Sequence, residues 1–172
     1  MSNKKIRNAT IAKSSGITFK SQLEKTIYNT LIEQGFTPKY EYITHDLWGS
    51  FTSLTPFYDK ETDKQQSNRI ENGSNIKSKI LVEKSSRIIG IRYTPDFYIR
   101  YKDLDVYIEA KGIENDVFYI KKKLFRKYLD NKLLNSGQHS IFFEVYTKKQ
   151  LLQAIDIFKQ YEQTLSNEKE TK

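Results

Sequence analysis

Apolar residues recur every three or four positions in three segments of the chain, a spacing that predicts three amphipathic helices. The first is expected to begin at an N-cap residue, Thr18, and to end at Gly35. The second covers about residues 114–134. The third begins at Thr147, which with Gln150 matches the pattern of a capping box.

Short apolar or alternating runs between these helices predict strands. They lie at about 36–44, 80–82, 87–93, 93–101, 106–111 and 141–146. A polar stretch at about 49–78 interrupts the pattern and predicts a long loop or insertion. The order of elements predicts a central mixed sheet flanked by helices, in the α/β or α+β class.

The length of 172 residues favours one domain, because domains usually have roughly 100–200 residues. We assign this domain to residues 17–165. The preceding segment is basic and poor in apolar side chains, which predicts a flexible basic arm at 1–16. The charged stretch 166–172 is expected to be a disordered tail.

The composition excludes several kinds of site. The chain has no cysteine and only two histidines, which excludes thiol catalysis and Cys-ligated metals and argues against His-rich sites. No apolar run approaches the roughly 20 residues that span a bilayer, and the basic N-terminus lacks the apolar region of a secretory signal. We therefore expect a cytoplasmic protein without a membrane partner.

The chain carries a formal net charge of +8. A surplus of this size is typical of proteins that bind a polyanion such as a nucleic acid. It is equally compatible with an ordinary soluble basic protein, so charge alone does not decide between the two.

The candidate chemistry lies on two neighbouring predicted strands. Asp96 follows Pro95, which cannot donate to a sheet ladder and so marks the start or edge of a strand. On the next strand Glu109 and Lys111 are two residues apart and point to the same face. The opposite face is apolar and is expected to pack on the core, which leaves the Glu–Lys face at a cleft or at solvent.

Asp96 and Glu109 are expected to come within reach of one metal ion, because neighbouring strands lie about 4.8 Å apart. Two converging carboxylates repel each other unless a hard cation such as Mg²⁺ lies between them. Such a cation can polarise a phosphoryl oxygen and activate water. Lys111 can hold that water and offset negative charge in the transition state.

Glu24 is a third candidate carboxylate. A helical projection of the first helix places it inside the apolar arc, where a carboxylate is costly unless it has a partner. A metal ion, or the ammonium of Lys111, would be such a partner.

These residues resemble the signature of the PD-(D/E)xK nuclease superfamily, with Pro95-Asp96 followed by Glu109-Ala110-Lys111. The resemblance covers about residues 18–146 and is greatest to phage endonucleases of the Holliday-junction-resolvase type. The segments that suggest this branch are Ile91–Phe97 and Phe118–Phe125. The resemblance implies a restriction-endonuclease-like fold with an αβββαβ core.

The resemblance also implies the roles of individual residues. Asp96 and Glu109 would bind Mg²⁺ or Mn²⁺, with the Ala110 carbonyl as a further ligand, and Lys111 would be the catalytic lysine. Glu24 would bind a second metal ion or an ordered water. The twelve residues between the two acids include Asp103 and Asp105, which a predicted hairpin tip holds away from the site.

Basic residues outside this group are candidate DNA contacts. On the helix at 114–134, Lys121 and Lys122 flank the apolar stripe, and Arg100 shares the face of Asp96 on its strand. The arm contributes the remaining candidates, Lys4, Lys5, Arg7 and Lys13.

The sequence thus predicts a metal-dependent endonuclease that acts on branched DNA as a homodimer, because two symmetric nicks need two sites. A restriction-type or transposon-end nuclease is an alternative, although 172 residues leave little room for a target-recognition domain. A non-catalytic nucleic-acid-binding module on the same fold is another. Each residue taken singly also fits a structural role, such as a turn aspartate or a solvated ion pair.

Overall fold

The computed structural model describes residues 11–55, 70–71, 74–75, 87–112 and 115–170. The described residues up to Leu47 and from Arg92 onward form one compact unit, and those within Trp48–Ile91 form a second. The helices are α1 (Gln22–Glu33), α3 (Asp116–Ser136) and α4 (Lys148–Glu170). The strands are β1 (Ala12–Ser14), β2 (Ile17–Phe19), β3 (Lys39–Tyr40), β4 (His45–Trp48), β5 (Phe51–Thr52), β6 (Ile70–Glu71), β7 (Ser74–Asn75), β8 (Arg87–Ile88), β9 (Ile91–Tyr93), β10 (Phe97–Tyr101), β11 (Leu104–Ala110) and β12 (Ser140–Val145).

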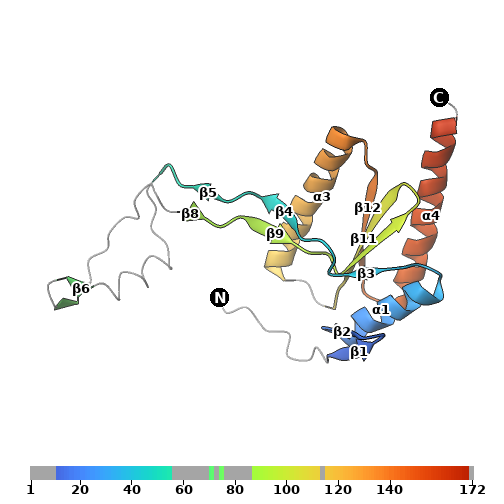
Figure 1. Cartoon of the computed structure of the whole chain (residues 1–172), viewed down its shortest axis with the longest axis horizontal. Coiled ribbons are helices and arrows are strands. Elements are labelled where there is room, and N and C mark those ends of the chain that lie inside the picture. Colours follow the sequence, from blue (N-terminus) through green and yellow to red (C-terminus); the bar gives the residue numbers. More distant parts are fainter. Residues whose placement is uncertain (1–10, 56–69, 72–73, 76–86, 113–114, 171–172) are drawn as a thin grey trace. The chain divides into compact units, whose positions relative to one another are not determined.

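A four-stranded mixed sheet with the order β12-β11-β10-β3 forms the centre of the first unit (Figure 1). β10 pairs antiparallel with both β3 and β11, and β11 pairs parallel with β12. Parallel neighbours need a crossover connection, which here is α3. The prediction of a mixed sheet with helices, in the α/β or α+β class, is therefore confirmed.

Both faces of this sheet contribute to buried clusters, because successive side chains along β10 and β11 point to opposite faces. One face of β10 and β11 packs with residues of α1 and α4 in an aliphatic and aromatic core. The other face packs on α3 through Tyr107, Phe118, Phe125 and Leu129. Figure 1 shows α3 and α4 on opposite sides of β11 and β12. Glu109, on the face that we expected at a cleft or at solvent, is only 6% exposed, so at this residue the face is not open to solvent.

The first helix begins later than predicted. Ser21, not Thr18, is its N-cap: the Ser21 hydroxyl accepts a hydrogen bond from the N–H of Glu24. Thr18 lies in β2, which pairs with β1 across a tight turn at Ser15 and Gly16. Both turn residues have positive φ, the conformation of two-residue hairpin loops, and a Ser-Gly pair tolerates it. Residues 12–16, which we predicted as the end of a flexible arm, thus belong to a hairpin with β2.

The C-terminal helices agree with the sequence prediction except at the end of the chain. Gly137 ends α3 in the left-handed conformation, and its N–H bonds to the carbonyl of Leu133. Thr147 accepts a hydrogen bond from the N–H of Gln150, as a capping box requires. The tail that we predicted to be disordered is helical as far as Glu170, because α4 extends to that residue.

The second unit contains the segment that we predicted as an insertion. Within it β5 pairs antiparallel with β8, and β6 with β7. The guanidinium of Arg87 donates to the Ser50 hydroxyl at 2.9 Å. The strand predicted at 80–82 lies outside the described residues. Among the helices of the described ranges, none combines the length and apolar character needed to cross a membrane.

Candidate active site

Asp96 stands directly before β10, beside the end of β11. The antiparallel register of these strands lets Asp96 Oδ2 accept a 2.8 Å hydrogen bond from the N–H of Ala110. The carbonyl of Asp96 accepts a second bond, at 2.8 Å, from the N–H of Glu41. The structure thus brings Asp96 next to the Glu109-Ala110 segment, as the strand pattern predicts.

The surroundings of Asp96 disfavour its negative charge. Burial raises the pKa of Asp96 to about 8, and the charge of Glu109 acts in the same direction. The charge of Glu24 adds to this rise in the Asp96 pKa, while the Ala110 N–H and the Lys111 ammonium oppose it. Carboxylates gathered with too little positive charge nearby are an arrangement that a hard cation stabilises.

Glu109 is held by two donors. The ammonium of Lys111 lies 2.8 Å from Glu109 Oε1, and the phenol of Tyr93 donates to Oε2 at 2.7 Å. Burial, together with the charge of Glu109, raises the pKa of Tyr93, so the phenol keeps its proton and remains a donor. These two contacts fix the orientation of the Glu109 carboxylate.

Lys111 lies between a carboxylate and an aromatic ring. Its Nζ stands 3.5 Å from the ring centre of Phe118, on α3, in addition to its ion pair with Glu109. Its main-chain N–H bonds to the carbonyl of Val145 at 2.9 Å, which continues the pairing of β11 with β12. The side chain is 18% exposed, so the ammonium is partly accessible to solvent.

Glu24 is buried, as the helical projection predicts. The partners of its carboxylate are hydrogen-bond donors of nearby residues. Its carboxylate accepts hydrogen bonds from the Ser21 hydroxyl at 2.8 Å, from the Lys20 N–H at 2.9 Å and from the Tyr40 phenol at 2.6 Å. The Glu24 N–H in turn donates to the Ser21 hydroxyl, so the two residues together cap the start of α1. Its burial is therefore explained without a metal ion, although its charge still acts on Asp96.

We expect Glu24→Ala to lower the free energy of unfolding by about 2 kcal/mol, because it leaves buried donors unpaired. The affinity for Mn²⁺ should stay close to that of the wild type. Urea unfolding and calorimetric titration with Mn²⁺ measure the two effects separately. Tyr40→Phe, which removes one of the same hydrogen bonds, is the matched control. Loss of one bound Mn²⁺ in Glu24→Ala would instead assign a ligand role to Glu24.

Asp96, Glu109 and Ala110 offer oxygen donors that suit a hard divalent cation, but only two of these donors are carboxylates. Asp96 and Glu109 supply carboxylate oxygens, and Ala110, between Glu109 and Lys111, supplies a main-chain carbonyl, which are the donors that Mg²⁺ and Mn²⁺ prefer. Within the described ranges, no three His, Asp or Glu side chains are grouped closely enough to hold a metal ion together. Burial and the charge of Glu109 raise the pKa of Asp96, and a cation beside this pair would offset both effects.

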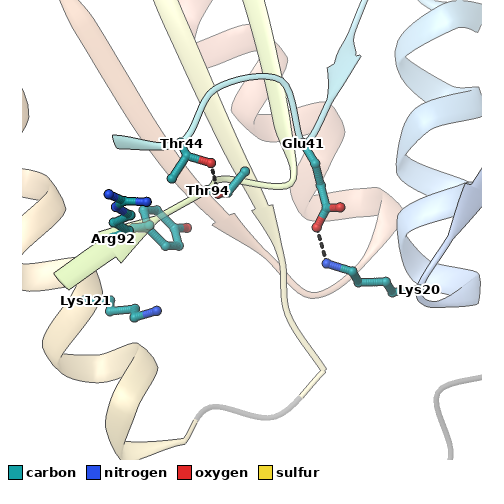
Figure 2. Close-up of a pocket in the computed structure, with 7 residues that line it drawn as sticks. Lys20, Glu41, Thr44, Arg92, Thr94 and Lys121 are labelled. Atoms are coloured by element: carbon teal, nitrogen blue, oxygen red, sulfur yellow. Dashed lines mark hydrogen bonds and ion pairs between the residues drawn. The ribbon is translucent and has the colours of Figure 1, made fainter. Parts of the chain in front are cut away.

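A pocket of about 490 Å³ adjoins this group of residues (Figure 2). Tyr93 connects the two, because it lines the pocket while its hydroxyl contacts Glu109. Figure 2 shows Arg92 and Lys121 on one side of the pocket and the ion-paired Lys20 and Glu41 on the other. The lining residues are Lys20, Glu41, Thr44, Arg92, Tyr93, Thr94 and Lys121.

The other predicted DNA contacts are placed differently. Lys122 lies 3.1 Å from Glu144, and both side chains are mostly buried. Arg100 pairs with Asp105 at 2.7 Å, at the end of β10 away from Asp96. Lys13 lies in β1. The arm residues lie outside the described ranges: Lys4, Lys5 and Arg7.

Asp105, in the β10–β11 hairpin, has other contacts than Asp96 and Glu109, as we expected. Burial alone would raise the pKa of Asp105, but hydrogen bonds from Lys132, Arg100 and Tyr98 outweigh it and hold the pKa below its ordinary value. These contacts form a structural network at the β10–β11 hairpin.

The sequence prediction missed Tyr93, Tyr40, Lys20 and Arg92. Tyr93 stands three residues before Asp96, and its role depends on a contact across the sheet that the linear pattern does not show. Comparison of the chain with protein-family models, with curated proteins and with solved structures gave no significant match.

Proposed function

We propose that this chain is a metal-dependent DNA endonuclease with the restriction-endonuclease-like fold of the PD-(D/E)xK superfamily. The observation that carries the proposal is the position of Asp96 beside the Glu109-Ala110 segment, held by the Ala110 N–H, with Lys111 2.8 Å from Glu109. The chain order of the helices and of the four sheet strands supports it, because α1, β3, β10, β11, α3 and β12 follow the αβββαβ pattern.

Asp96 and Glu109 would hold a Mg²⁺ or Mn²⁺ ion, with the Ala110 carbonyl as a further ligand. When bound, the ion would supply Lewis-acid chemistry, polarising a phosphoryl oxygen and lowering the pKa of a water. The backbone hydrogen bond to Asp96 and the Tyr93 phenol on Glu109 hold the two carboxylates in place. Their orientation is therefore set before any substrate arrives.

Lys111 would act on the reacting groups directly. Its ammonium can donate to the attacking water and to an oxygen of the phosphate that gains negative charge in the transition state. Phe118 and Glu109 hold this ammonium on two sides, and its partial exposure leaves a direction from which a phosphate can approach. A positioned donor of this kind contributes most when water is excluded around it.

For a nuclease, a net charge of +8 agrees with DNA as the substrate. We propose branched DNA, bound by a homodimer in the cytoplasm, because lysines act as point charges on phosphates and no segment resembles a helix that reads base edges. Selection would then depend on the shape of the DNA, through two basic surfaces presented by the dimer.

A labelled four-way junction and a linear duplex of the same sequence test this function. With Mg²⁺ we expect the junction to be cut and the duplex to be cut much less, and with EDTA we expect neither to be cut. Preferential cutting of one linear sequence would replace the resolvase assignment by a restriction-type or transposon-end nuclease. Binding without any metal-dependent cleavage would identify a non-catalytic nucleic-acid-binding module.

A further inference from the structure

The pocket beside Tyr93 has the composition of an anion site. Three of its lining side chains are cationic and one is a carboxylate. Two hydroxyl groups also line it, from Thr44 and Thr94, whose oxygens lie 2.7 Å apart. Hydroxyls and cationic side chains are the groups that proteins commonly use to contact the phosphates of DNA.

The three cations differ in how firmly they are held. Lys20 is ion-paired with Glu41. The Nε of Arg92 lies 2.9 Å from Asp46, but both side chains are about 70% exposed, with values of 73% and 70%. Exposed pairs of this kind contribute little free energy and exchange partners readily.

Lys121 is the available cation. Among the described residues it has no hydrogen-bond or ion-pair partner, in contrast to its neighbour Lys122, which pairs with Glu144. Lys121 projects from α3 toward the pocket in Figure 2. An unpaired ammonium beside two hydroxyls leaves an anion as the natural ligand of this pocket.

The position of the pocket restricts which anion this is. Tyr93 contacts both the pocket and Glu109, and Thr94 is two residues from Asp96. Each strand of duplex DNA carries one phosphate for about every 3.4 Å of helix axis. A strand with one phosphate at the Asp96–Glu109 pair therefore brings a further phosphate close to the pocket within one or two nucleotides.

We propose that the pocket binds one backbone phosphate of the substrate strand, next to the phosphate at the Asp96–Glu109 pair, and that Lys121 supplies the decisive charge. This inference rests on the proposed function in taking DNA as the ligand. It adds a second phosphate site that fixes the position of the strand relative to the reacting groups. Arg92 exchanges Asp46 for the same phosphate when the strand binds.

Binding of a labelled four-way junction and of the matched duplex in EDTA tests the proposal without cleavage. Lys121→Ala should weaken binding about tenfold, as loss of a hydrogen bond to a charged group does. The slope of log affinity against log salt should fall by about 1. Lys121→Arg should restore most of the affinity. The control is Lys127→Ala, an exposed lysine of the same helix that does not line the pocket and should have almost no effect.

Neutral methylphosphonate linkages, placed one at a time in the DNA strand, locate the contact. At one linkage the wild type should lose about tenfold in affinity, while Lys121→Ala loses nothing further. At all other linkages the two proteins should respond alike. Equal penalties for both proteins at every linkage, or equal binding by Lys121→Ala and Lys127→Ala, would overturn the proposal.

Three further outcomes separate this inference from the proposed nuclease function and from a site for free phosphate. If one neutral linkage weakens the wild type but not Lys121→Ala, and Mg²⁺ gives no cleavage, the nuclease proposal is refuted and the phosphate site is supported. Cleavage without that coupling would refute the phosphate site alone. Protection of the wild type against thermal unfolding by inorganic phosphate, lost in Lys121→Ala while DNA affinity is unchanged, would show a site for free phosphate and refute a DNA contact.

Discussion

Lys111→Ala should abolish DNA cleavage and should also lower the free energy of unfolding by about 3 kcal/mol. The first effect follows because no other ammonium contacts Glu109 among the described residues. The second follows because the carboxylate of Glu109, 6% exposed, would remain buried without its counter-charge. Single-turnover cleavage at saturating enzyme and urea unfolding measure the two effects, while junction affinity should change little.

The double variant Glu109→Gln with Lys111→Ala separates chemistry from stability. Removing the charge of Glu109 as well should recover most of the lost stability, because no unpaired carboxylate remains, but cleavage should stay absent. Lys123→Ala, an exposed lysine on the helix that carries Phe118, is the control and should leave both properties unchanged. Near-normal single-turnover cleavage by Lys111→Ala would show that a different residue acts on the water.

The central sheet could be predicted because its strands carry strong local patterns. In β11 the residues Val106 and Ile108 form one apolar face, and both are fully buried in the core with α1 and α4. The pairing of β10 with β11 follows from a short hairpin, so Asp96 comes beside Ala110 as the spacing predicts. The parallel position of β12 follows from the crossover through α3.

The burial of Glu109 could not be predicted from the alternation of its own strand. The face that carries Glu109 also carries Tyr107, and both are buried; Tyr107 packs with Phe118 and Phe125 of α3. The sequence shows Phe118 and Phe125 as a helical stripe but not which face of the sheet that stripe covers. The side that we expected at a cleft or at solvent therefore contributes Tyr107 to a second core.

The start of α1 shows how two valid local signals can compete. Thr18 and Ser21 are both acceptable N-cap residues, and only Ser21 has a glutamate three residues later, Glu24, whose N–H it caps. The deciding factor is the hairpin of β1 and β2, which places Phe19 in a strand and in the core. Glu24 is consequently placed by its cap and by Tyr40, a residue from β3 that no local pattern connects with it.

Asp96→Asn should eliminate metal binding and cleavage but should not destabilise the metal-free protein. The pKa of Asp96 is raised to about 8 by burial and by Glu109, so near neutral pH the side chain of the metal-free protein is largely an uncharged acid. Asparagine resembles that uncharged acid in shape and charge, but it is a poor ligand for Mg²⁺ or Mn²⁺. Calorimetric titration with Mn²⁺ should therefore show binding to the wild type and none to the variant.

The same substitution should change the pH dependence of stability in EDTA. A carboxyl whose pKa is about 8 in the folded state, against an ordinary 3.8, favours folding most below pH 4, and this contribution is lost as the pH rises to about 8. The wild type should thus lose stability relative to Asp96→Asn across that range and no further above it. The control Asp103→Asn, at a carboxylate that is 72% exposed, should show neither effect. Wild-type affinity of Asp96→Asn for Mn²⁺ would exclude Asp96 as a ligand. Parallel stability curves in EDTA would instead show that Asp96 is ionised in the metal-free fold, with the Ala110 N–H and the Lys111 ammonium stabilising its charge.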